Sequence, residues 1–252
     1  MSVAEALLQV TDLTKRFGGL LANNALSLDI GAGELHAVIG PNGAGKTTLI
    51  SQLAGELRPD EGTIRFAGED IVAISAAGRV HRGLARSFQI PQLLNDYTAC
   101  ENVMLAAQAK AGHSYRFWSD ARRDLRLRLV AMESLERVGL TPRSEVAVKE
   151  LAHGEQKQLE LAIALATGPR MLLLDEPMAG LGAAECAQMI DLLRELKQQV
   201  TILLVEHDMD AVFALADRVS VLVNGQRVAT GTSEQVKSDP AVRTAYLGEG
   251  YT

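Results

Sequence analysis

Residues 40–48 read G-P-N-G-A-G-K-T-T, and their G-x-x-x-x-G-K-T pattern is typical of a loop that wraps a phosphate group. Such a loop works only between a strand and a helix, because that arrangement aims backbone N–H groups and the helix dipole at one anion. Both neighbours are predicted: residues 34–39 form a short apolar run, and residues 48–57 carry apolar side chains at helical spacing. The sequence therefore predicts an α/β fold with a site for a nucleoside triphosphate.

The residue types in this loop indicate separate tasks. We expect Gly43 and Gly45 to adopt backbone angles that other residues avoid. Lys46 would reach the β and γ phosphates, and the Thr47 hydroxyl would hold Mg²⁺. The alternative is a glycine-rich loop that contains Lys-Thr-Thr without binding a ligand. Phe17 also has two interpretations, because an aromatic ring favours both stacking on adenine and packing in a core.

Composition argues against several classes of function. The 252 residues suit one large domain, and they contain no second loop of this kind. The 31 acidic and 25 basic residues give a net charge of −6, which argues against a nucleic-acid partner. Cys100 and Cys186 are far apart in the sequence, so we expect both to be reduced thiols. Apolar runs stay far below the roughly 20 residues that span a bilayer, and no secretory signal is evident, so we expect an intracellular protein that does not cross the membrane itself.

Two further groups of elements are predicted around the loop. Alternating apolar residues at 7–30 and 62–68 predict a small antiparallel sheet, with a turn at Gly18-Gly19. Residues 95–144 predict helices at 101–111 and, after a break at Gly112, at 119–138. We interpret this segment as a helical subdomain inserted into the nucleotide domain. Its basic residues form either a solvated helix face or a ligand site, and they are Arg122, Arg123, Arg126 and Arg128.

Two carboxylates follow a strongly apolar strand. Residues 171–177 read M-L-L-L-D-E-P, so a buried strand ends in Asp175 and Glu176. We expect Asp175 to hold the Mg²⁺ shell and Glu176 to orient or deprotonate water. The alternative, a plain surface turn, does not explain two acids at this position downstream of a phosphate loop.

Polar residues also follow two other predicted strands. Residues 201–205 are apolar and lead to His207, which we interpret as a γ-phosphate sensor rather than a structural histidine. The reason is that parallel strands present their carboxyl ends to the same crevice. Gln89, at the end of a strand predicted at 84–89, is a weaker signal of the same kind.

A second possible anion site precedes a helix predicted at residues 155–167. Gly154 comes directly before this helix, with His153 and Glu155 beside it, and helix N-termini attract anions. The alternative is a loop cap without a ligand. Downstream, the sequence predicts helices at 185–199 and 211–216 and a hairpin whose turn is Asn224-Gly225.

These motifs resemble those of the ATP-binding subunit of an ABC transporter, and the resemblance covers nearly the whole chain. Six motifs match in order: residues 40–48 resemble the Walker A loop, Gln89 the Q-loop glutamine, residues 151–156 the signature motif, residues 172–176 the Walker B strand with its catalytic glutamate, residues 179–182 the D-loop, and His207 the switch histidine.

The resemblance implies one ABC ATPase domain over residues 1–252. Its P-loop NTPase (RecA-like) core with an antiparallel β subdomain would comprise residues 1–94 and 145–252, and its helical insert residues 95–144. Catalysis is implied for Glu176, His207 and Lys46, and a metal shell for Thr47, Gln89 and Asp175. The nucleotide would contact Gly40, Pro41, Asn42, Gly43, Ala44, Gly45, Lys46, Thr47, Thr48, Phe17 and Gln89. The signature residues, which act on the nucleotide of a second subunit, would be Leu151, Ala152, His153, Gly154, Glu155 and Gln156.

The resemblance also implies a mechanism and partners. Two ATPase subunits, identical or sister chains, would pair head to tail around ATP and Mg²⁺, and closure of this dimer would drive transport. Integral-membrane permease subunits would dock on the insert around residues 89–103, with a periplasmic or extracellular binding protein acting indirectly. We therefore expect a peripheral protein on the cytoplasmic face of the bacterial inner membrane.

Within the family, the stretches K-R-F-G-G-L, G-L-A-R-S-F-Q-I-P and L-A-H-G-E-Q and the ending Y-L-G most resemble the LivG-type ATPase of branched-chain (hydrophobic) amino-acid importers. Relatives with similar features serve urea or amide uptake or lipopolysaccharide export. A different class is the soluble, non-transport ABC ATPase, but those proteins carry two nucleotide modules or long coiled-coil insertions, which this chain lacks.

The signature motif and the D-loop depart from the common family pattern. Ala152 and His153 replace the Ser and first Gly of L-S-G-G-Q, and Gly182 stands where Asp or Asn is usual. The missing serine hydroxyl removes one hydrogen bond to the γ-phosphate, worth about 0.5–1.5 kcal/mol. The change at Gly182 is expected to alter communication between the two sites of a dimer.

Overall fold

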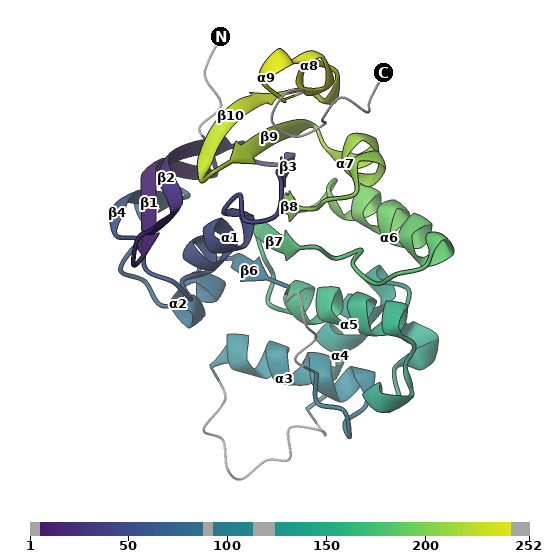
Figure 1. Cartoon of the computed structure of the whole chain (residues 1–252). Helices are drawn as coiled ribbons and strands as arrows, with labels where there is room; N and C mark the ends of the chain where they lie inside the picture. The colour runs from purple at the N-terminus through teal and green to yellow at the C-terminus, as the bar shows by residue number, and fades with distance from the viewer. Residues whose placement is uncertain (1–5, 88–92, 113–123, 243–252) are drawn as a thin grey trace.

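A computed structural model describes residues 6–87, 93–112 and 124–242 of the chain. In Figure 1 a central sheet runs through the middle of the molecule, a smaller sheet lies to one side of it, and a group of helices lies below. This is the α/β architecture that the sequence predicts, with an antiparallel sheet and added helices beside the core.

The central sheet of the described residues has the strand order β10-β9-β3-β8-β7-β6. Its middle strands read LHAVI, MLLLD and TILLV, and all their residues are buried, as expected for parallel strands covered on both faces. Neighbours from β9 to β6 pair in parallel, whereas β10 is antiparallel to β9. The strands are β3 (Leu35–Ile39), β6 (Leu84–Arg86), β7 (Met171–Asp175), β8 (Thr201–Val205), β9 (Arg218–Val223) and β10 (Gln226–Gly231).

The smaller sheet is antiparallel, with the order β2-β1-β4-β5 among the described residues. Its first hairpin turns at Gly18, whose φ of 57° suits glycine, as the Gly18-Gly19 pair predicts. The later strand predicted at residues 62–68 is also present. The four strands are β1 (Leu8–Phe17), β2 (Leu20–Ile30), β4 (Glu61–Phe66) and β5 (Glu69–Asp70).

Helix α1 (Lys46–Ala54) lies between the two sheets (Figure 1). Its fully buried side chains Leu49, Ile50 and Leu53 pack in one cluster with residues of both sheets, such as Ile64 of β4. Burying each such side chain stabilises the fold by about 1.5–3 kcal/mol. The helix that carries the phosphate loop is therefore fixed from two sides.

Helices α3 (Ala99–Ala111) and α4 (Leu125–Arg137) form the lower part of the molecule in Figure 1. Thr98 caps α3 through a capping box with Glu101, and α3 ends at Gly112 with a φ of 72°, which confirms the predicted break. The carboxylate of Asp124 accepts the N–H groups of Arg126 and Leu127 at the start of α4. Residues 113–123, which include Arg122 and Arg123, lie outside the described residues.

The two residues of the predicted arginine run that the structure describes lie on the solvent face of α4. Arg126 and Arg128 are both exposed, and Arg128 pairs with the exposed Glu145 at 2.6 Å. Of the two interpretations of the arginine run, the solvated face is correct for these two residues.

Helix α5 (His153–Ala166) packs with α3 and α4 in one hydrophobic cluster that continues onto β7. A link from α3 to the core is made by Lys110, whose ammonium donates to the carbonyls of Val80 and His81 at the end of α2 (Ala76–His81), 3.0 Å in each case. The division of the chain into residues 1–94, 95–144 and 145–252 stays a prediction.

The remaining helices cover the central sheet and complete the domain. Buried valines of α7, α8 and α9 pack on β3 and β9, while α6 packs against β7 and β8. None of the helices in the described ranges is long and apolar enough to cross a membrane. Their bounds are α6 (Ala183–Leu196), α7 (Met209–Leu215), α8 (Ser233–Ser238) and α9 (Pro240–Val242), with 3-10 turns at Thr141–Arg143 and Val148–Glu150.

Candidate active site

The predicted phosphate loop connects β3 to α1, so the strand–loop–helix arrangement is confirmed. Gly45 caps α1 with a φ of 99°, and a Cβ atom there would lie 2.2 Å from the carbonyl oxygen of Ala22. A Cβ atom on Gly40 would lie equally close to the carbonyl oxygen of Leu222. Both positions therefore require glycine, because neighbouring backbone fills the space where a side chain would begin.

The turn between β9 and β10 supports the same loop. The N–H of Gly225 donates to the carbonyl oxygen of Ala44 at 3.0 Å, and the N–H of Asn24 donates to the carbonyl oxygen of Gly225 at 2.9 Å. A Cβ atom on Gly225 would lie 2.7 Å from the carbonyl oxygen of Ala22. The hairpin predicted at Asn224-Gly225 is thus present and is hydrogen-bonded to the phosphate loop.

Lys46 crosses the loop that it belongs to. Its ammonium donates to the carbonyl oxygens of Gly40 at 2.7 Å and Pro41 at 3.2 Å. Burial lowers the pKa of Lys46, and the charges of Glu176 and Asp175 oppose this change. The cation is therefore held over the loop, within the field of both carboxylates.

A hollow of about 250 Å³ opens over the loop. It is lined by Phe17, Leu20, Ala22, residues 42–48 and Glu176. Phe17 is 49% exposed, so the interpretation of this ring as a core residue is wrong. An exposed aromatic ring at the rim of a phosphate loop is instead available to stack on a base.

Asp175 ends β7 with a buried side chain. Its Oδ2 accepts a hydrogen bond from Nη2 of Arg86 at 3.0 Å, and Arg86 also pairs with Glu56 at the end of α1. Burial raises the pKa of Asp175, while the charge of Arg86 lowers it. Its Oδ1 is buried and has no hydrogen-bond partner among the described residues, so one oxygen is left for a ligand from outside the chain.

The residues at this position fit a magnesium ion. A carboxylate oxygen without a partner and the hydroxyl of Thr47, in the first turn of α1, are the oxygen ligands that Mg²⁺ prefers. The third predicted ligand, Gln89, lies outside the described residues.

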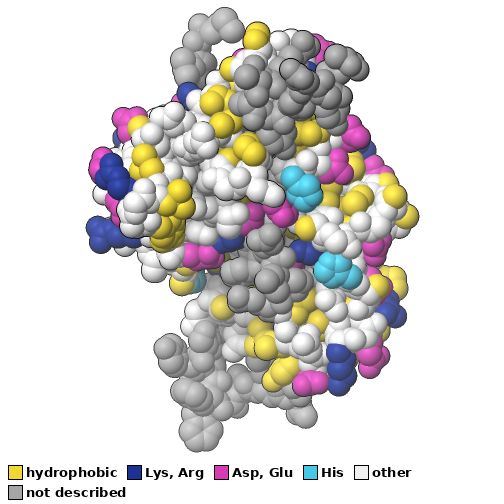
Figure 2. Space-filling model, viewed as in Figure 1, with side chains coloured by type: hydrophobic (Ala, Val, Ile, Leu, Met, Phe, Trp, Pro, Cys, Tyr) yellow, Lys and Arg dark blue, Asp and Glu magenta, His cyan; other side chains and the backbone are white. Residues whose placement is uncertain are grey.

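Glu176 and His207 meet at the ends of two neighbouring strands. β7 and β8 are parallel, with Asp175 opposite Val205, which confirms that the strands end at the same edge. Oε1 of Glu176 lies 3.9 Å from Nδ1 of His207. Figure 2 shows acidic and histidine side chains on this face, where the upper part of the molecule meets the lower helices.

Two neighbours of the site were not singled out from the sequence. Glu206 is fully buried, and its carboxylate accepts the N–H groups of Met178 at 2.9 Å and His207 at 3.1 Å. Burial raises the pKa of Glu206, and these two hydrogen bonds lower it. Arg86, the partner of Asp175, is the other. The sequence feature that could have revealed them is a charged residue beside apolar ones: Arg86 is the last residue of the strand β6, and Glu206 directly follows the strand β8.

The signature residues lie elsewhere in the described structure. None of residues 151–156 is among the described residues that line the hollow over the phosphate loop. The helix α5 begins at His153, two residues before the predicted start, because Ala152 is extended and its N–H donates to Oε2 of Glu155 at 2.9 Å. His153 lies beside the D-loop, since a Cβ atom on Gly180 would be 3.2 Å from its Nε2.

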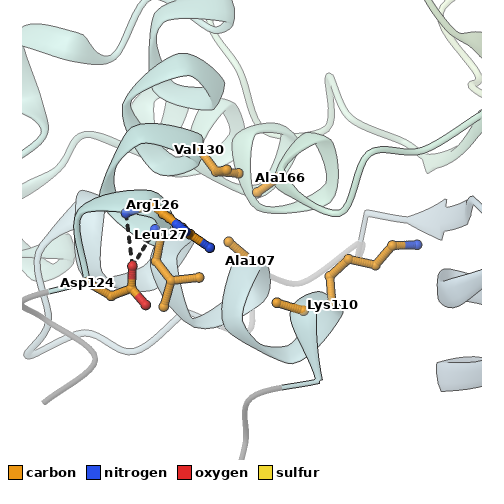
Figure 3. Close-up of a pocket in the computed structure, with 8 residues that line it drawn as sticks. Ala107, Lys110, Asp124, Arg126, Leu127, Val130 and Ala166 are labelled. Atoms are coloured by element: carbon orange, nitrogen blue, oxygen red, sulfur yellow. Dashed lines mark hydrogen bonds between the residues drawn. The ribbon is translucent and has the colours of Figure 1, made fainter. Parts of the chain in front are cut away.

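A larger hollow of about 700 Å³ lies between α3, α4 and the end of α5 (Figure 3). Its carboxylate, Asp124, is engaged in capping α4, and the ammonium of Lys110 extends away toward α2. Its other lining residues are the exposed Arg126 and apolar side chains that include Ala107, Leu127 and Val130. Size alone therefore does not mark the catalytic site, because the groups that could do chemistry surround the smaller hollow.

A glycine loop between a parallel strand and a helix, with two carboxylates at the end of a second strand, defines a P-loop nucleotide-binding protein. A family model for the ABC transporter matches residues 23–179, and one for the branched-chain amino acid ATP-binding cassette transporter matches residues 226–252. The chain belongs to the ABC transporter family and is one of its ATP-binding cassettes.

Similar proteins match nearly the full length of the chain. The high-affinity branched-chain amino acid transport ATP-binding protein BraF of Pseudomonas aeruginosa is 39% identical over 256 residues, covering 98% of this chain and all of that protein. The corresponding protein LivG of Escherichia coli is 37% identical with the same coverage. The crystal structure of the ADP conformation of an ABC-transporter cassette has a TM-score of 0.86 and 32% identity, covering 97% of this chain and 99% of that one.

Proposed function

We propose that this chain is the ATP-hydrolysing subunit of a membrane importer for branched-chain or other hydrophobic amino acids. BraF and LivG, which are named for branched-chain amino acid transport, match it over nearly its full length and support this substrate class. The observation that carries the hydrolysis step is the approach of Glu176 to His207 beside the phosphate loop, at 3.9 Å.

ATP would bind with its phosphates in the loop at residues 40–48. The backbone N–H groups of the loop and the N-terminus of α1 would face the phosphate oxygens. Lys46 would exchange the carbonyl oxygens of Gly40 and Pro41 for the β and γ phosphates. Phe17, exposed at the rim, would stack on the adenine ring.

Asp175 and Thr47 would hold Mg²⁺, with Gln89 as a third ligand. When bound, the ion neutralises negative charge on the phosphate oxygens. The oxygen of Asp175 that has no partner among the described residues supports this role. Arg86 would balance the charge of the other oxygen of Asp175.

Glu176 would orient the attacking water and accept its proton. As the water oxygen bonds to the γ-phosphorus, the bond from that phosphorus to the β–γ bridging oxygen breaks, which yields ADP and inorganic phosphate. His207 would donate a hydrogen bond to the γ-phosphate and hold it in line. Both side chains therefore contribute mainly by positioning and by charge.

The complete site would need a second ATPase chain. Residues 151–156 do not line the hollow over the phosphate loop of their own chain. Helix α5 begins within this segment, at His153, and its first N–H groups have no partner within the helix. Ala152 provides no side-chain cap for them. We infer that they bind the γ-phosphate of ATP held by a head-to-tail partner, either a sister chain or a second copy.

The helical part of the chain would dock on integral-membrane permease subunits. Exposed apolar side chains at Leu94, Tyr97 and Leu105 support such a contact. The chain would then lie on the cytoplasmic face of the bacterial inner membrane, and a periplasmic or extracellular binding protein would act through the permease.

The test is ATP hydrolysis by the complex of this chain with its membrane subunits in liposomes. We expect leucine, isoleucine or valine, with the matching binding protein, to stimulate hydrolysis, and the same complex with Glu176→Gln to stay inactive. Stimulation by urea and not by these amino acids would show that the substrate is urea, and the proposed amino-acid substrate class would be wrong. Full activity of the isolated chain, with no membrane subunit co-purifying, would favour a soluble ATPase.

A further inference from the structure

Glu206 connects the two loops that carry the proposed catalytic side chains. It follows the last residue of β8, and its side chain is fully buried. One oxygen, Oε1, accepts the N–H of Met178 at 2.9 Å, and the other, Oε2, accepts the N–H of His207 at 3.1 Å. A single carboxylate thus joins the loop after β7 to the loop after β8.

The loop after β7 needs such support because Glu176 has an unfavourable backbone. Its φ of 50° lies in the left-handed region, which residues with a side chain rarely adopt and which persists only where the surroundings fix it. The turn is held from one side by the N–H of Glu176, which donates to the carbonyl oxygen of Val205 at 2.9 Å. It is held from the other side by Glu206 through Met178.

The loop after β8 is held in the same way. Oε2 of Glu206 accepts the backbone N–H of His207, and this hydrogen bond fixes the backbone from which the imidazole extends. Nδ1 of His207 lies 3.8 Å from this oxygen and 3.9 Å from Oε1 of Glu176. This ring nitrogen is therefore about equally far from the buried carboxylate and from the proposed catalytic one.

We propose that Glu206 is a positioning residue that sets Glu176 and His207 at their mutual distance by accepting one backbone N–H from each loop. This role rests on the proposed function, in which both side chains act on the same γ-phosphate. Glu206 itself has no surface exposed to solvent, so it acts through the two loops and not on the reacting atoms.

The geometry demands a glutamate and not merely a polar residue. Both oxygens accept N–H groups, so an amide would direct its NH₂ group against one of these donors and leave that donor buried without a partner. An aspartate keeps the charge, but it is one methylene shorter and cannot span both donors. Glu206→Gln and Glu206→Asp therefore disturb the same link by different means.

The test measures hydrolysis in the complex with the membrane subunits, and nucleotide binding and backbone amide exchange in the full chain. The variants are Glu206→Gln and Glu206→Asp, and the matched control is Asp210→Asn, which removes the charge of an exposed acid on the following helix. We expect both Glu206 variants to lose about 10- to 100-fold in kcat, with KM and the Kd of an ATP analogue within about twofold of wild type. We also expect exchange at the amides of Met178 and His207 to become about 10-fold faster.

Several results would overturn the proposal. Unchanged amide exchange at Met178 and His207 would show that Glu206 does not hold these loops, whatever the rate of hydrolysis. A parallel loss of kcat and nucleotide binding, or a failure of both variants to fold, would make Glu206 a general stability residue. If the wild-type complex with its membrane subunits binds nucleotide without hydrolysing it, the proposed function fails, and the amide exchange in the chain still decides the role of Glu206.

Discussion

The guanidinium of Arg86 donates a 3.0 Å hydrogen bond to the buried carboxylate of Asp175, from the strand next to β7. Arg86→Met would leave that carboxylate buried without its cation, so we expect the free energy of unfolding to fall by about 3 kcal/mol. Urea unfolding without nucleotide measures this change. The control is Arg82→Met, which removes an exposed pair with Glu69 and should scarcely change stability.

A double variant separates the charge effect from lost packing. Arg86→Met with Asp175→Asn removes both charges, so it should be more stable than Arg86→Met alone. If the stability that the double variant loses relative to wild type equals the sum of the two single losses, the two side chains do not interact energetically.

Glu176→Gln should stop hydrolysis while leaving nucleotide binding intact. The amide keeps the size of the side chain but cannot accept a proton from water, so we expect kcat to fall at least about 100-fold. The Kd of ATP should change by less than about threefold, because Glu176 only borders the hollow. Gel filtration with ATP should then show a trapped dimer. Hydrolysis by Glu176→Gln at the wild-type rate would show that Glu176 is not the catalytic base.

Two glycines of the phosphate loop should differ in their tolerance of alanine. Both have positive φ, but a Cβ atom on Gly45 would lie 2.2 Å from the carbonyl oxygen of Ala22, whereas one on Gly43 meets nothing within 4 Å. We expect Gly45→Ala to cost at least about 2 kcal/mol of stability and Gly43→Ala about 1 kcal/mol. Thermal unfolding of the two variants tests this order, which equal losses would contradict.

Glu34 should make stability depend on pH. Burial alone raises the pKa of Glu34, but hydrogen bonds from His36 at 2.7 Å and from the N–H of Gly31 at 2.8 Å outweigh it, with Arg218 nearby, so the pKa is lowered. The folded chain therefore holds the charged form more strongly than the unfolded chain does. The resulting stability is complete above the unfolded pKa and is lost as the pH falls through the folded pKa.

We expect Glu34→Gln to destabilise the chain at pH 7 and to differ less from wild type at pH 4. Urea unfolding at both values measures this, with Glu133→Gln, an exposed position on α4, as the control. An equal difference at the two pH values would show that Glu34 acts through packing alone.

Much of the site was predictable because its strands carry an unmistakable pattern. β7 and β8 are fully buried and are apolar apart from Asp175 and Thr201, a pattern typical of parallel strands in a covered sheet. Once they are neighbours, Glu176 and His207 meet at one edge. The phosphate loop was predictable for a similar reason, since its glycines and Lys46 form a local motif.

The parts that were not predicted depend on contacts between distant segments. The start of α5 was placed two residues late because Ala152 is not a typical N-cap residue, and the side chain of Glu155 satisfies its N–H instead. In the sequence, Glu206 looks like a solvated acid. In the fold it is buried, and its carboxylate accepts the backbone N–H groups of Met178 and His207, which only the folded loops bring within reach. Gln89 lies outside the described residues, and its role stays a prediction.

The contact between the phosphate loop and the β9–β10 turn is made by backbone atoms, through the N–H and the carbonyl oxygen of Gly225. The packing around this contact excludes a side chain at Gly225, where a Cβ atom would lie 2.7 Å from the carbonyl oxygen of Ala22, and at Gly40, where one would lie 2.2 Å from that of Leu222. Side-chain substitutions in β10, which follows this turn, therefore leave both backbone hydrogen bonds in place. The match to the branched-chain amino acid cassette model begins at residue 226, directly after this turn, so the sequence that distinguishes this subfamily can vary there without changing the phosphate loop.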